Sequence, residues 1–287
     1  MARFAASFSR LVLPAVQPRL VLVAVIVALA AAVNLFLAGR SVGLVLDGEP
    51  AVDWIQYVEA ARRVGTPSLY EVSNEYAYRY SPLLAYLFGP LSVLGAAGWR
   101  LLHIVAALAL PTWPLRVLTL LSWPFWYDVQ TGNVLVFVLL AGAWALRGRR
   151  VGIGCYLLIA ILVPRPLMIP LAAWLLWKQP SWRAPFVAAL AVQGLVTGAL
   201  GLIDDWMAAL IAAGEDVFNP SNVGPSRLIG TGPWVLVGMP LAAWLTWRGR
   251  VGLASLAASP YWLPYYLLVP LLDLARWRPS TLPRKTQ

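Results

Sequence analysis

Residues 20–38 read L-V-L-V-A-V-I-V-A-L-A-A-A-V-N-L-F-L-A, and this stretch decides the fold class. It is an apolar run that only Asn34 interrupts. A helix needs about 20 such residues to cross the hydrocarbon core of a bilayer, so the run is long enough to span a membrane. It is longer than the apolar part of a typical signal peptide, and no small-residue cleavage site precedes Arg40. We therefore expect residues 20–38 to form the first transmembrane helix.

The composition of the whole chain agrees with a membrane protein. Its 287 residues are 60% hydrophobic, with a mean hydropathy of +0.72. These values are typical of a polytopic membrane protein rather than a soluble domain. The length leaves no room for a separate soluble module, so we expect one membrane domain over residues 1–287. The single cysteine, Cys155, excludes a disulfide within the chain.

The distribution of charge predicts the orientation. A net charge of +10 would suggest nucleic-acid binding in a soluble protein, but the basic residues here lie at the ends of apolar segments, as the positive-inside rule requires. We therefore expect no nucleic-acid partner. Alternate segment ends carry basic residues such as Arg100, Arg147 and Lys178, and the acids gather at the other ends. This pattern predicts cytoplasmic termini in a bacterial plasma membrane, with external loops over residues 39–79 and 204–230.

The apolar runs predict an all-α, polytopic bundle with about ten transmembrane segments. Several runs are shorter than the roughly 20 residues of a full span, so we expect some half-helices. Pro111, Pro114 and Arg116 interrupt the third run, which could form one kinked helix or a short hairpin followed by a helix. The predicted segments are residues 20–38, 80–97, 101–127, 131–147, 151–163, 166–178, 184–203, 231–247, 250–259 and 261–275.

The first external loop holds half of the carboxylates. Six of the twelve acidic residues fall between Asp47 and Glu75. Residues 53–64 have the pattern of a helix that lies in the membrane interface. Its apolar stripe is predicted to hold Trp54, Val58 and Ala61, and its opposite face Asp53, Gln56, Ala60 and Arg63.

No motif of a soluble enzyme is present in the sequence. It lacks a glycine-rich phosphate loop, an H-E-x-x-H pair and a pair of cysteines at metal-binding spacing. The only histidine, His103, falls at the predicted inner start of a helix, so we expect an interfacial role with no triad or metal cluster around it. No D-x-D pair occurs, so we expect neither a metal nor an organic cofactor. Catalysis would have to use carboxylates and arginines near the outer face.

Seven short motifs follow one another along the chain. They are D-W-I-Q-Y-V-E-A-A at 53–61, G-T-P-S-L-Y at 65–70, Y-S-P-L at 80–83, Q-T-G-N at 130–133, P-R-P-L-M-I-P at 164–170, N-P-S-N-V-G-P-S-R-L at 219–228 and A-S-P-Y-W-L-P-Y-Y at 258–266. In this order they resemble motifs of the polyprenyl-phosphate-mannose-dependent glycosyltransferases of family 87, within the GT-C superfamily. Two departures occur: the glycine and glutamine of the family's G-Q-x-N step are displaced, and Arg165 replaces the lysine of its K-P-x-P segment.

The resemblance implies a reaction and a set of site residues. GT-C enzymes move a sugar from a lipid-phosphate carrier to an acceptor hydroxyl on the non-cytoplasmic side of the membrane. The transfer needs a carboxylate that accepts the proton of the acceptor, and Asp53 is the candidate. The leaving phosphate needs a cation, and arginine has the geometry to bind it. The candidates for the phosphate are Arg165, Arg227 and Arg79, and those for the sugar or acceptor are Tyr57, Tyr80, Asp128, Gln130, Asn133, Asn222 and Tyr265.

We therefore expect an inverting hexosyltransferase that takes mannose from a lipid-linked donor and passes it to a glycolipid or glycan acceptor of the cell envelope. Other interpretations stay open. Asp53 could cap an interfacial helix, Arg165 could reach the outer headgroups without a ligand, and Asp128 could either orient the Q-T-G-N turn or face a cavity. The chain could also be a lipid or glycolipid transporter, or an assembly subunit, derived from this family. A transporter would place polar residues along both leaflets, whereas here they crowd the predicted outer half.

Overall fold

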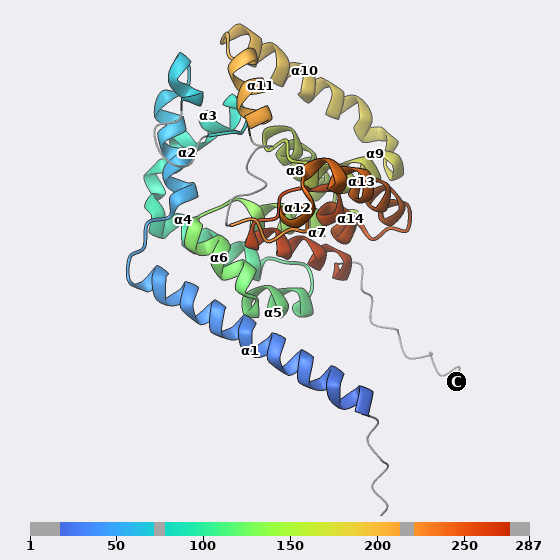
Figure 1. The fold of residues 1–287 in the computed structure, drawn as a ribbon. Coiled ribbons are helices and arrows are strands. Elements are labelled where there is room, and N and C mark those ends of the chain that lie inside the picture. Colours follow the sequence, from blue (N-terminus) through green and yellow to red (C-terminus); the bar gives the residue numbers. More distant parts are fainter. Residues whose placement is uncertain (1–17, 72–77, 213–220, 276–287) are drawn as a thin grey trace, which may run out of the picture.

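The protein is helical throughout the part of the chain that the structure describes (Figure 1). A computed structural model describes residues 18–71, 78–212 and 221–275, and no strand occurs among them. The α-helices are α1 (Pro18–Leu46), α2 (Val52–Arg63), α3 (Pro82–Leu91), α4 (Gly95–Leu108), α5 (Trp113–Leu121), α6 (Trp123–Thr131), α7 (Leu135–Leu146), α8 (Arg150–Leu162), α9 (Ile169–Lys178), α10 (Arg183–Ala199), α11 (Ile203–Ala212), α12 (Ser226–Ile229), α13 (Thr231–Trp247) and α14 (Val251–Ala258). The 3₁₀ helices are η1 (Pro67–Tyr70), η2 (Ser92–Leu94), η3 (Pro166–Met168), η4 (Pro180–Trp182) and η6 (Pro264–Leu274).

Helix α1 is the longest element and lies along the outside of the bundle (Figure 1). Its segment Leu22–Leu46 has a mean hydropathy of 2.6, and only Ala38 and Ser41 are buried in it, while every residue from Leu22 to Val33 is exposed. Soluble proteins rarely expose so large a continuous apolar surface. The polar residue of the run, Asn34, is paired: its side chain donates to Leu121 O and accepts from Trp123 N, each at 2.8 Å. Asn34 therefore fixes α1 to the junction of α5 and α6.

Two segments among the described residues are long and apolar enough to cross a membrane, Leu22–Leu46 and Pro82–Leu108. A third appears if α10 and α11, which bend by 110° at their junction, count as one span. Four further apolar helical segments are only 10–17 residues long. The predicted all-α class is confirmed, and the number of about ten crossings stays a prediction.

The centre of the bundle is built from α7, α8, α9, α14 and η6. Leu139, Leu171 and Leu272 are fully buried there. Helices α7 and α8 pack as an antiparallel pair, and Gly152 permits their close approach, because a Cβ there would lie 2.6 Å from the backbone nitrogen of Ala145. Helices in lipid associate mainly through such close packing of small residues. The pair brings the start of α7 and the end of α8 to one end of the bundle.

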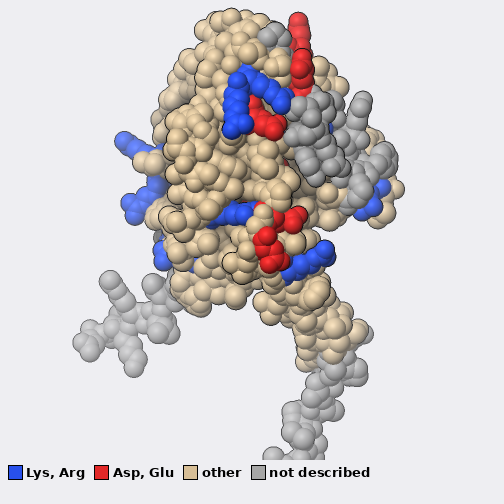
Figure 2. Space-filling model, turned by 90° about the vertical axis from the view of Figure 1, so that its left-hand side faces the viewer, with Lys and Arg blue, Asp and Glu red and all other residues tan. Residues whose placement is uncertain are grey.

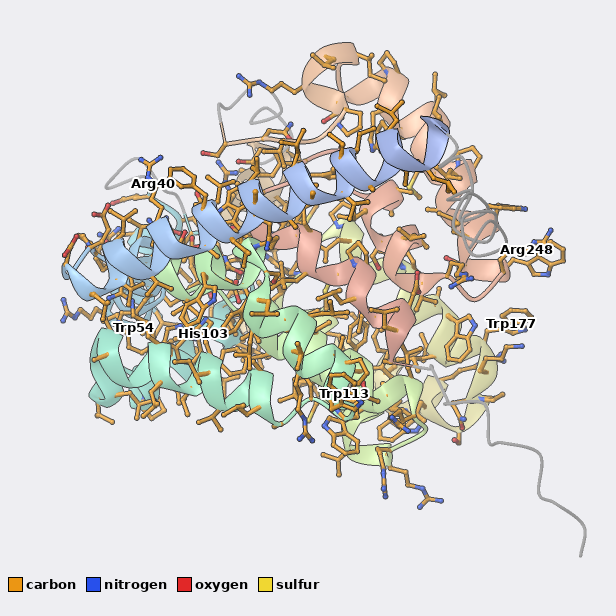
Figure 3. All side chains as sticks on the ribbon, turned by 90° about the horizontal axis from the view of Figure 1, so that it is seen from below. Arg40, Trp54, His103, Trp113, Trp177 and Arg248 are labelled. Atoms are coloured by element: carbon orange, nitrogen blue, oxygen red, sulfur yellow. The ribbon has the colours of Figure 1, made fainter. Side chains whose placement is uncertain are left out.

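A second core, rich in aromatic rings, holds α2 against α3 and α4. Trp54 of α2 stacks on Trp99 of α4 with ring centroids 5.0 Å apart, and it meets Phe88 of α3 at 5.8 Å. Such pairs contribute about 0.5–1.5 kcal/mol each beyond the area that they bury. Figure 3 shows Trp54 and His103 at the same end of the molecule as Arg40. The aromatic core therefore docks the first predicted loop onto the bundle.

The helix predicted over residues 53–64 forms as α2, but its buried face differs from the prediction. Because α2 packs into the aromatic core, burial follows the side that faces α3 and α4 rather than the most apolar stripe. The buried residues are Trp54, Gln56, Tyr57 and Ala60, whereas Val58 and Ala61 are half-buried.

Of the two interruptions expected between residues 80 and 131, the structure has only the second. Helical structure continues from Pro82 to Leu108 through α3, η2 and α4, so the predicted boundary at residues 98–100 is wrong. The predicted interruption near Pro111 is present, and α5 and α6 follow it as two short helices. Proline ends a helix because it lacks the backbone N–H and its ring clashes with the preceding turn.

Arg100 does not lie where the charge pattern predicts it. Its guanidinium donates to the carbonyl oxygens of Glu49, Val129 and Gln130. It therefore lies beside the first loop, and not on the opposite side of a membrane from it. Figure 2 shows similar mixing, because basic and acidic side chains stand next to one another on the face that it draws. Arg100 joins α4 to the first loop and to the end of α6 through these hydrogen bonds. Its charge therefore does not indicate on which side of a membrane it lies.

Candidate functional site

Asp53 and Asn133 form the centre of the candidate site. Asp53 is half-buried in the first turn of α2. The side-chain Nδ2 of Asn133 donates a hydrogen bond to Oδ2 of Asp53 at 3.0 Å. Oδ1 of Asn133 accepts from Val134 N at 2.8 Å, so the amide is fixed with its nitrogen toward Asp53. The carboxylate is therefore held by the turn that precedes α7.

That turn depends on Gly132. It ends α6 with φ at 74°, a left-handed conformation that favours glycine. A Cβ at Gly132 would also lie 2.9 Å from Cβ of Trp54 and 3.3 Å from Cδ1 of Trp99. The indole Nε1 of Trp99 donates to Gly132 O at 2.8 Å. The backbone conformation and the contact with α2 therefore both require glycine here.

A buried histidine lies behind the turn. His103 is fully buried in α4, so the predicted interfacial role is wrong; α4 packs this face against the start of α7. Its Nε2 lies 2.6 Å from Asn133 O, and its Nδ1 lies 2.9 Å from Trp99 O. A neutral imidazole donates through one nitrogen only, so both contacts are hydrogen bonds only when the ring is doubly protonated. Oδ2 of Asp128 lies 3.8 Å from Nε2.

Asp128 orients the turn. Its Oδ2 accepts from Val136 N at 2.9 Å. This N–H is one of the donors at the start of a helix that have no partner within it. Asn133 accepts from the N–H of Val134, the residue before α7, so one side chain of α6 and one of the turn both bind backbone donors at the start of α7. The other oxygen of Asp128 has no hydrogen-bond partner among the described residues.

The surroundings of Asp53 make it a stronger base than a carboxylate in water. Burial raises the pKa of Asp53 above its ordinary value of 3.8. The amide of Asn133, the hydroxyl of Thr131 and the charge of Arg165 act in the opposite direction and limit the rise. A base whose pKa lies nearer to neutral takes a proton more readily.

Arg165 lies in the loop between α8 and η3, at the same end of the α7–α8 pair as Asn133. Prolines on both sides favour an extended backbone there, and φ and ψ are −110° and 144°. Its Nη2 donates to Oη of Tyr80 at 3.1 Å, and its guanidinium lies 5.0 Å from the centroid of the Tyr80 ring. Tyr80 in turn packs against Tyr57 of α2, with ring centroids 5.6 Å apart, and the charge of Arg165 lowers the pKa of Asp53 on the same helix.

A small cavity of about 160 Å³ brings Arg165 together with Arg79. Tyr80, Tyr261 and Tyr266 also line it. Arginine is suited to bidentate binding of phosphate, and it keeps its charge when it is partly buried. The cavity is therefore a candidate anion site.

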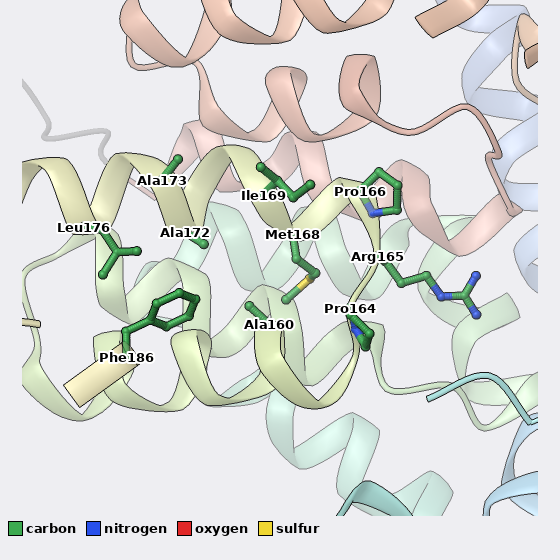
Figure 4. A pocket seen from close by; sticks show the side chains of 10 residues that line it. All are labelled: Ala160, Pro164, Arg165, Pro166, Met168, Ile169, Ala172, Ala173, Leu176 and Phe186. Carbon is green, nitrogen blue, oxygen red and sulfur yellow. The ribbon is translucent and has the colours of Figure 1, made fainter. Parts of the chain in front are cut away.

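An apolar groove of about 410 Å³ begins on the other side of the same loop (Figure 4). Pro164, Arg165 and Pro166 line both the groove and the cavity. In Figure 4 the guanidinium of Arg165 points away from the apolar side chains of the groove, among them Phe186 and Leu176. A cation next to an apolar groove suits an amphipathic ligand with an anionic head and an apolar tail.

Seven of the predicted site residues gather around this end of the bundle. Tyr57 and Tyr80 are buried with ring centroids 5.6 Å apart. Tyr265 is buried and lies within electrostatic reach of Asp53 and Arg165. The group consists of Asp53, Tyr57, Arg79, Tyr80, Asn133, Arg165 and Tyr265.

Three other predicted residues occupy different positions. Gln130 offers its backbone carbonyl to Arg100. Asn222 accepts from Gly224 N and from Trp262 N, each at 2.9 Å, and so ties two loops together. Arg227 is exposed on α12 and does not line the cavity of Arg165.

Sequence reasoning missed His103, Trp99 and Thr131 as members of the site. One signal was present for the first two, because Trp99 and His103 are four residues apart and so share a helix face. Thr131 lies inside the Q-T-G-N motif, and its local sequence carries no signal that would set it apart. Among the described residues, no group of three or more His, Cys, Asp or Glu side chains could hold a metal ion.

Comparison with known proteins assigns no family and no function to the chain. The chain matches no protein-family model, no curated protein and no solved structure. The function proposed below rests on the residues of the site and on the motifs that contain them.

Proposed function

We propose that this protein is a membrane glycosyltransferase of GT-C type. It transfers a hexose, with mannose implied by the resemblance to family 87, from a polyprenyl-phosphate carrier to a glycolipid or glycan acceptor. One observation carries the proposal: Asp53, a half-buried carboxylate that Asn133 holds by a hydrogen bond, lies at the end of the bundle where Arg165 and Arg79 line one cavity. A base and a phosphate-binding cation are the two groups that such a transfer needs.

In this proposal Asp53 is the general base. It accepts the proton of the acceptor hydroxyl while the hydroxyl oxygen bonds to the anomeric carbon and the bond from that carbon to the phosphate oxygen breaks. The attack comes from the face opposite the phosphate, so the configuration inverts. The carrier phosphate leaves as an anion, which needs a cation and no proton donor. Asn133 holds the carboxylate in position through its hydrogen bond.

Arg165 and Arg79 bind the carrier phosphate, and the adjoining groove receives the first part of the apolar chain. The groove of about 410 Å³ and the cavity of about 160 Å³ support this assignment, because the Pro164–Pro166 loop lines both. Tyr80 orients the guanidinium of Arg165 through its hydroxyl and its ring. The reaction needs no metal or organic cofactor, because the donor is already activated as a phosphate ester.

The active site faces the extracytoplasmic side in this proposal, and both termini lie in the cytoplasm. The support comes from the predicted use of a lipid-linked donor and from the basic residues that precede the first helix. A tag at either terminus would then be protected from protease in intact cells.

The proposal is tested by transfer of label from radioactive polyprenyl-phosphate-mannose to lipid or glycan in membranes that contain the protein. Transfer with the wild-type chain and its loss with Asp53→Asn support the enzyme. Movement of labelled lipid between leaflets without any transfer would instead support a transporter.

A further inference from the structure

A second groove lies along the α7–α8 pair, away from the candidate site. It has a volume of about 680 Å³. Phe137 and Leu140 of α7 and Ile159 of α8 give it an apolar lining, and Arg149 and Arg150 line it at the loop that joins the two helices. From Arg150 to Ile159 the groove extends about 13 Å along α8, at 1.5 Å per residue. We call it the Arg149 groove.

No described residue neutralises the positive charge of the Arg149 groove. Arg149 and Arg150 are exposed, and neither forms an ion pair within the part of the chain that the structure describes. No acidic residue lines the groove. The guanidinium of Arg149 lies 5.7 Å from the centroid of the Trp144 ring. Tryptophan beside arginine is typical of the level at which lipid headgroups lie.

The Arg149 groove is separate from the anion site of Arg165. Asn133 precedes α7, whereas Arg149 follows it, so the length of this helix, about 18 Å, separates them. Arg165 follows α8 and lies at the Asn133 end of the pair. One phosphate therefore cannot occupy both places.

We propose that the Arg149 groove binds an anionic phospholipid of the bilayer, with its phosphate on Arg149 and Arg150 and one acyl chain along α7 and α8. Arginine pairs bidentately with phosphate, and basic pockets between membrane helices bind anionic headgroups. A zwitterionic lipid offers the same tail, but its ammonium group offsets the phosphate charge. Charge complementarity therefore selects an anionic lipid for this groove.

Another groove of the molecule is also apolar but has no arginine in its lining, so the arginine pair distinguishes the Arg149 groove from it. A groove of about 410 Å³ between α9 and α13 has apolar residues and the rings of Trp174, Trp177 and Trp247 in its wall, but no arginine. Arg248 and Arg250 lie beyond it, in the loop between α13 and α14, and line no part of it. This second basic loop provides a matched control.

Cys155 supplies a reporter for the test. It is exposed, it lines the Arg149 groove and it is the only cysteine of the chain. We expect bound lipid to slow its reaction with N-ethylmaleimide in the purified full-length protein in uncharged detergent. Since each arginine contributes about fivefold in affinity, phosphatidylglycerol should protect Cys155 at a concentration about 25-fold lower than phosphatidylcholine does. Cys155→Ser gives the background of the assay.

Variants separate the charge from the apolar contact. Arg149→Gln with Arg150→Gln should abolish the preference for phosphatidylglycerol, and Arg150→Gln alone should reduce it to about fivefold. Arg248→Gln with Arg250→Gln removes the same charge elsewhere and should leave the preference intact. Thermal unfolding of each variant identifies any that fails to fold. If the double variant does not fold, the lipid preference of Arg150→Gln alone tests the proposal.

Three results would overturn the proposal. The first is equal protection of Cys155 by phosphatidylcholine and phosphatidylglycerol, which would mean an apolar contact only. The second is a preference for phosphatidylglycerol that survives the loss of both arginines. The third is protection that rises with protein concentration in the absence of lipid, which would mean that a second copy of the chain covers the groove.

Discussion

Asn133 and Asp53 lie 80 residues apart in the chain, yet Nδ2 of the first is 3.0 Å from Oδ2 of the second. The amide of Asn133 cannot turn round without loss of this bond and of its bond to Val134 N. The base of the proposed reaction is thus positioned by a turn that also caps α7. Changes in the turn should therefore affect both the pKa of Asp53 and the stability of the protein.

Asn133→Ala is expected to move the acidic limb of the pH–rate profile to higher pH. The hydrogen bond from Asn133 lowers the pKa of Asp53, so its loss lets burial raise that pKa further. The base works only when it is deprotonated, and activity is lost as the pH falls through its pKa. The profile of sugar transfer in each variant gives the shift. Asn34→Ala, which alters an asparagine on α1, is the control and should not shift the acidic limb of the pH–rate profile. A shift of the same size in this control would contradict the prediction.

Gly132→Ala is expected to destabilise the protein more than Gly148→Ala does. Both glycines have a left-handed backbone conformation, with φ at 74° and 75°. Alanine at either position is therefore expected to lower the free energy of unfolding by about 1–2 kcal/mol through backbone strain. A Cβ at Gly132 would also meet Trp54 at 2.9 Å, whereas a Cβ at Gly148 meets nothing within 4 Å. We expect a further loss of about 1–3 kcal/mol at Gly132 from overpacking. Equal unfolding temperatures for the two variants would show that the contact with Trp54 carries no weight.

Arg165→Gln is expected to raise the KM for the lipid-linked donor. Hydrogen bonds to charged groups contribute about 1.5–3 kcal/mol, so kcat/KM should fall by about ten- to a hundredfold. Arg165→Lys keeps the charge but loses the bidentate geometry and should lie between this variant and the wild type. Arg248→Gln is the control and should have no effect, because Arg248 is exposed and lies at the opposite end of the molecule from Trp54 and His103 in Figure 3. An unchanged KM for Arg165→Gln would remove this residue from the donor site.

Asp128→Ala and Asp128→Asn are expected to differ in stability. The alanine variant leaves Val136 N–H at the buried start of α7 without its acceptor, at a cost of about 1–3 kcal/mol. The asparagine variant keeps an oxygen for that N–H, so it should unfold at a higher temperature than the alanine variant. Thermal unfolding of the two purified variants gives the comparison. Equal losses in both would mean that the hydrogen bond to Val136 N does not stabilise the start of α7.

The helical class and several element positions could be predicted from the sequence because apolar runs dictate them. The run over residues 231–247 coincides with α13, and the helix predicted over residues 53–64 forms as α2. The motif around Asp53 marks it as the candidate base among six carboxylates, and this role stays a prediction. These features depend on short stretches of sequence, so they can be predicted without knowing how distant segments pack.

The contacts that complete the site could not be predicted, because they depend on how distant segments pack. Nothing local to His103 shows that Asn133 O will lie 2.6 Å from its ring. The charge of Arg100 suggested a membrane side, whereas the structure uses it to bind three carbonyl groups. The buried face of α2 is the one that packs against α3 and α4, and not the most apolar stripe of its sequence.

The proposed function depends on Asp53, and we expect the variant Asp53→Asn to keep the fold. The Oδ1 of asparagine can still accept from Asn133 Nδ2. Because the pKa of Asp53 is raised in the folded protein, ionisation of this group costs stability; the cost is absent below its ordinary pKa and complete above the raised one. Asp53→Asn should therefore unfold at a higher temperature than the wild type at neutral pH, and the difference should shrink on acidification.

The most direct test of the central claim is the rate of sugar transfer from polyprenyl-phosphate-mannose by the wild type and by Asp53→Asn, at equal amounts of folded protein. Loss of a general base typically lowers the rate by about 10²- to 10⁴-fold, and we expect a loss of that size. The KM for the donor should stay nearly unchanged, because Arg165 remains in place. Transfer by Asp53→Asn at the rate of the wild type would contradict the assignment of Asp53 as the base.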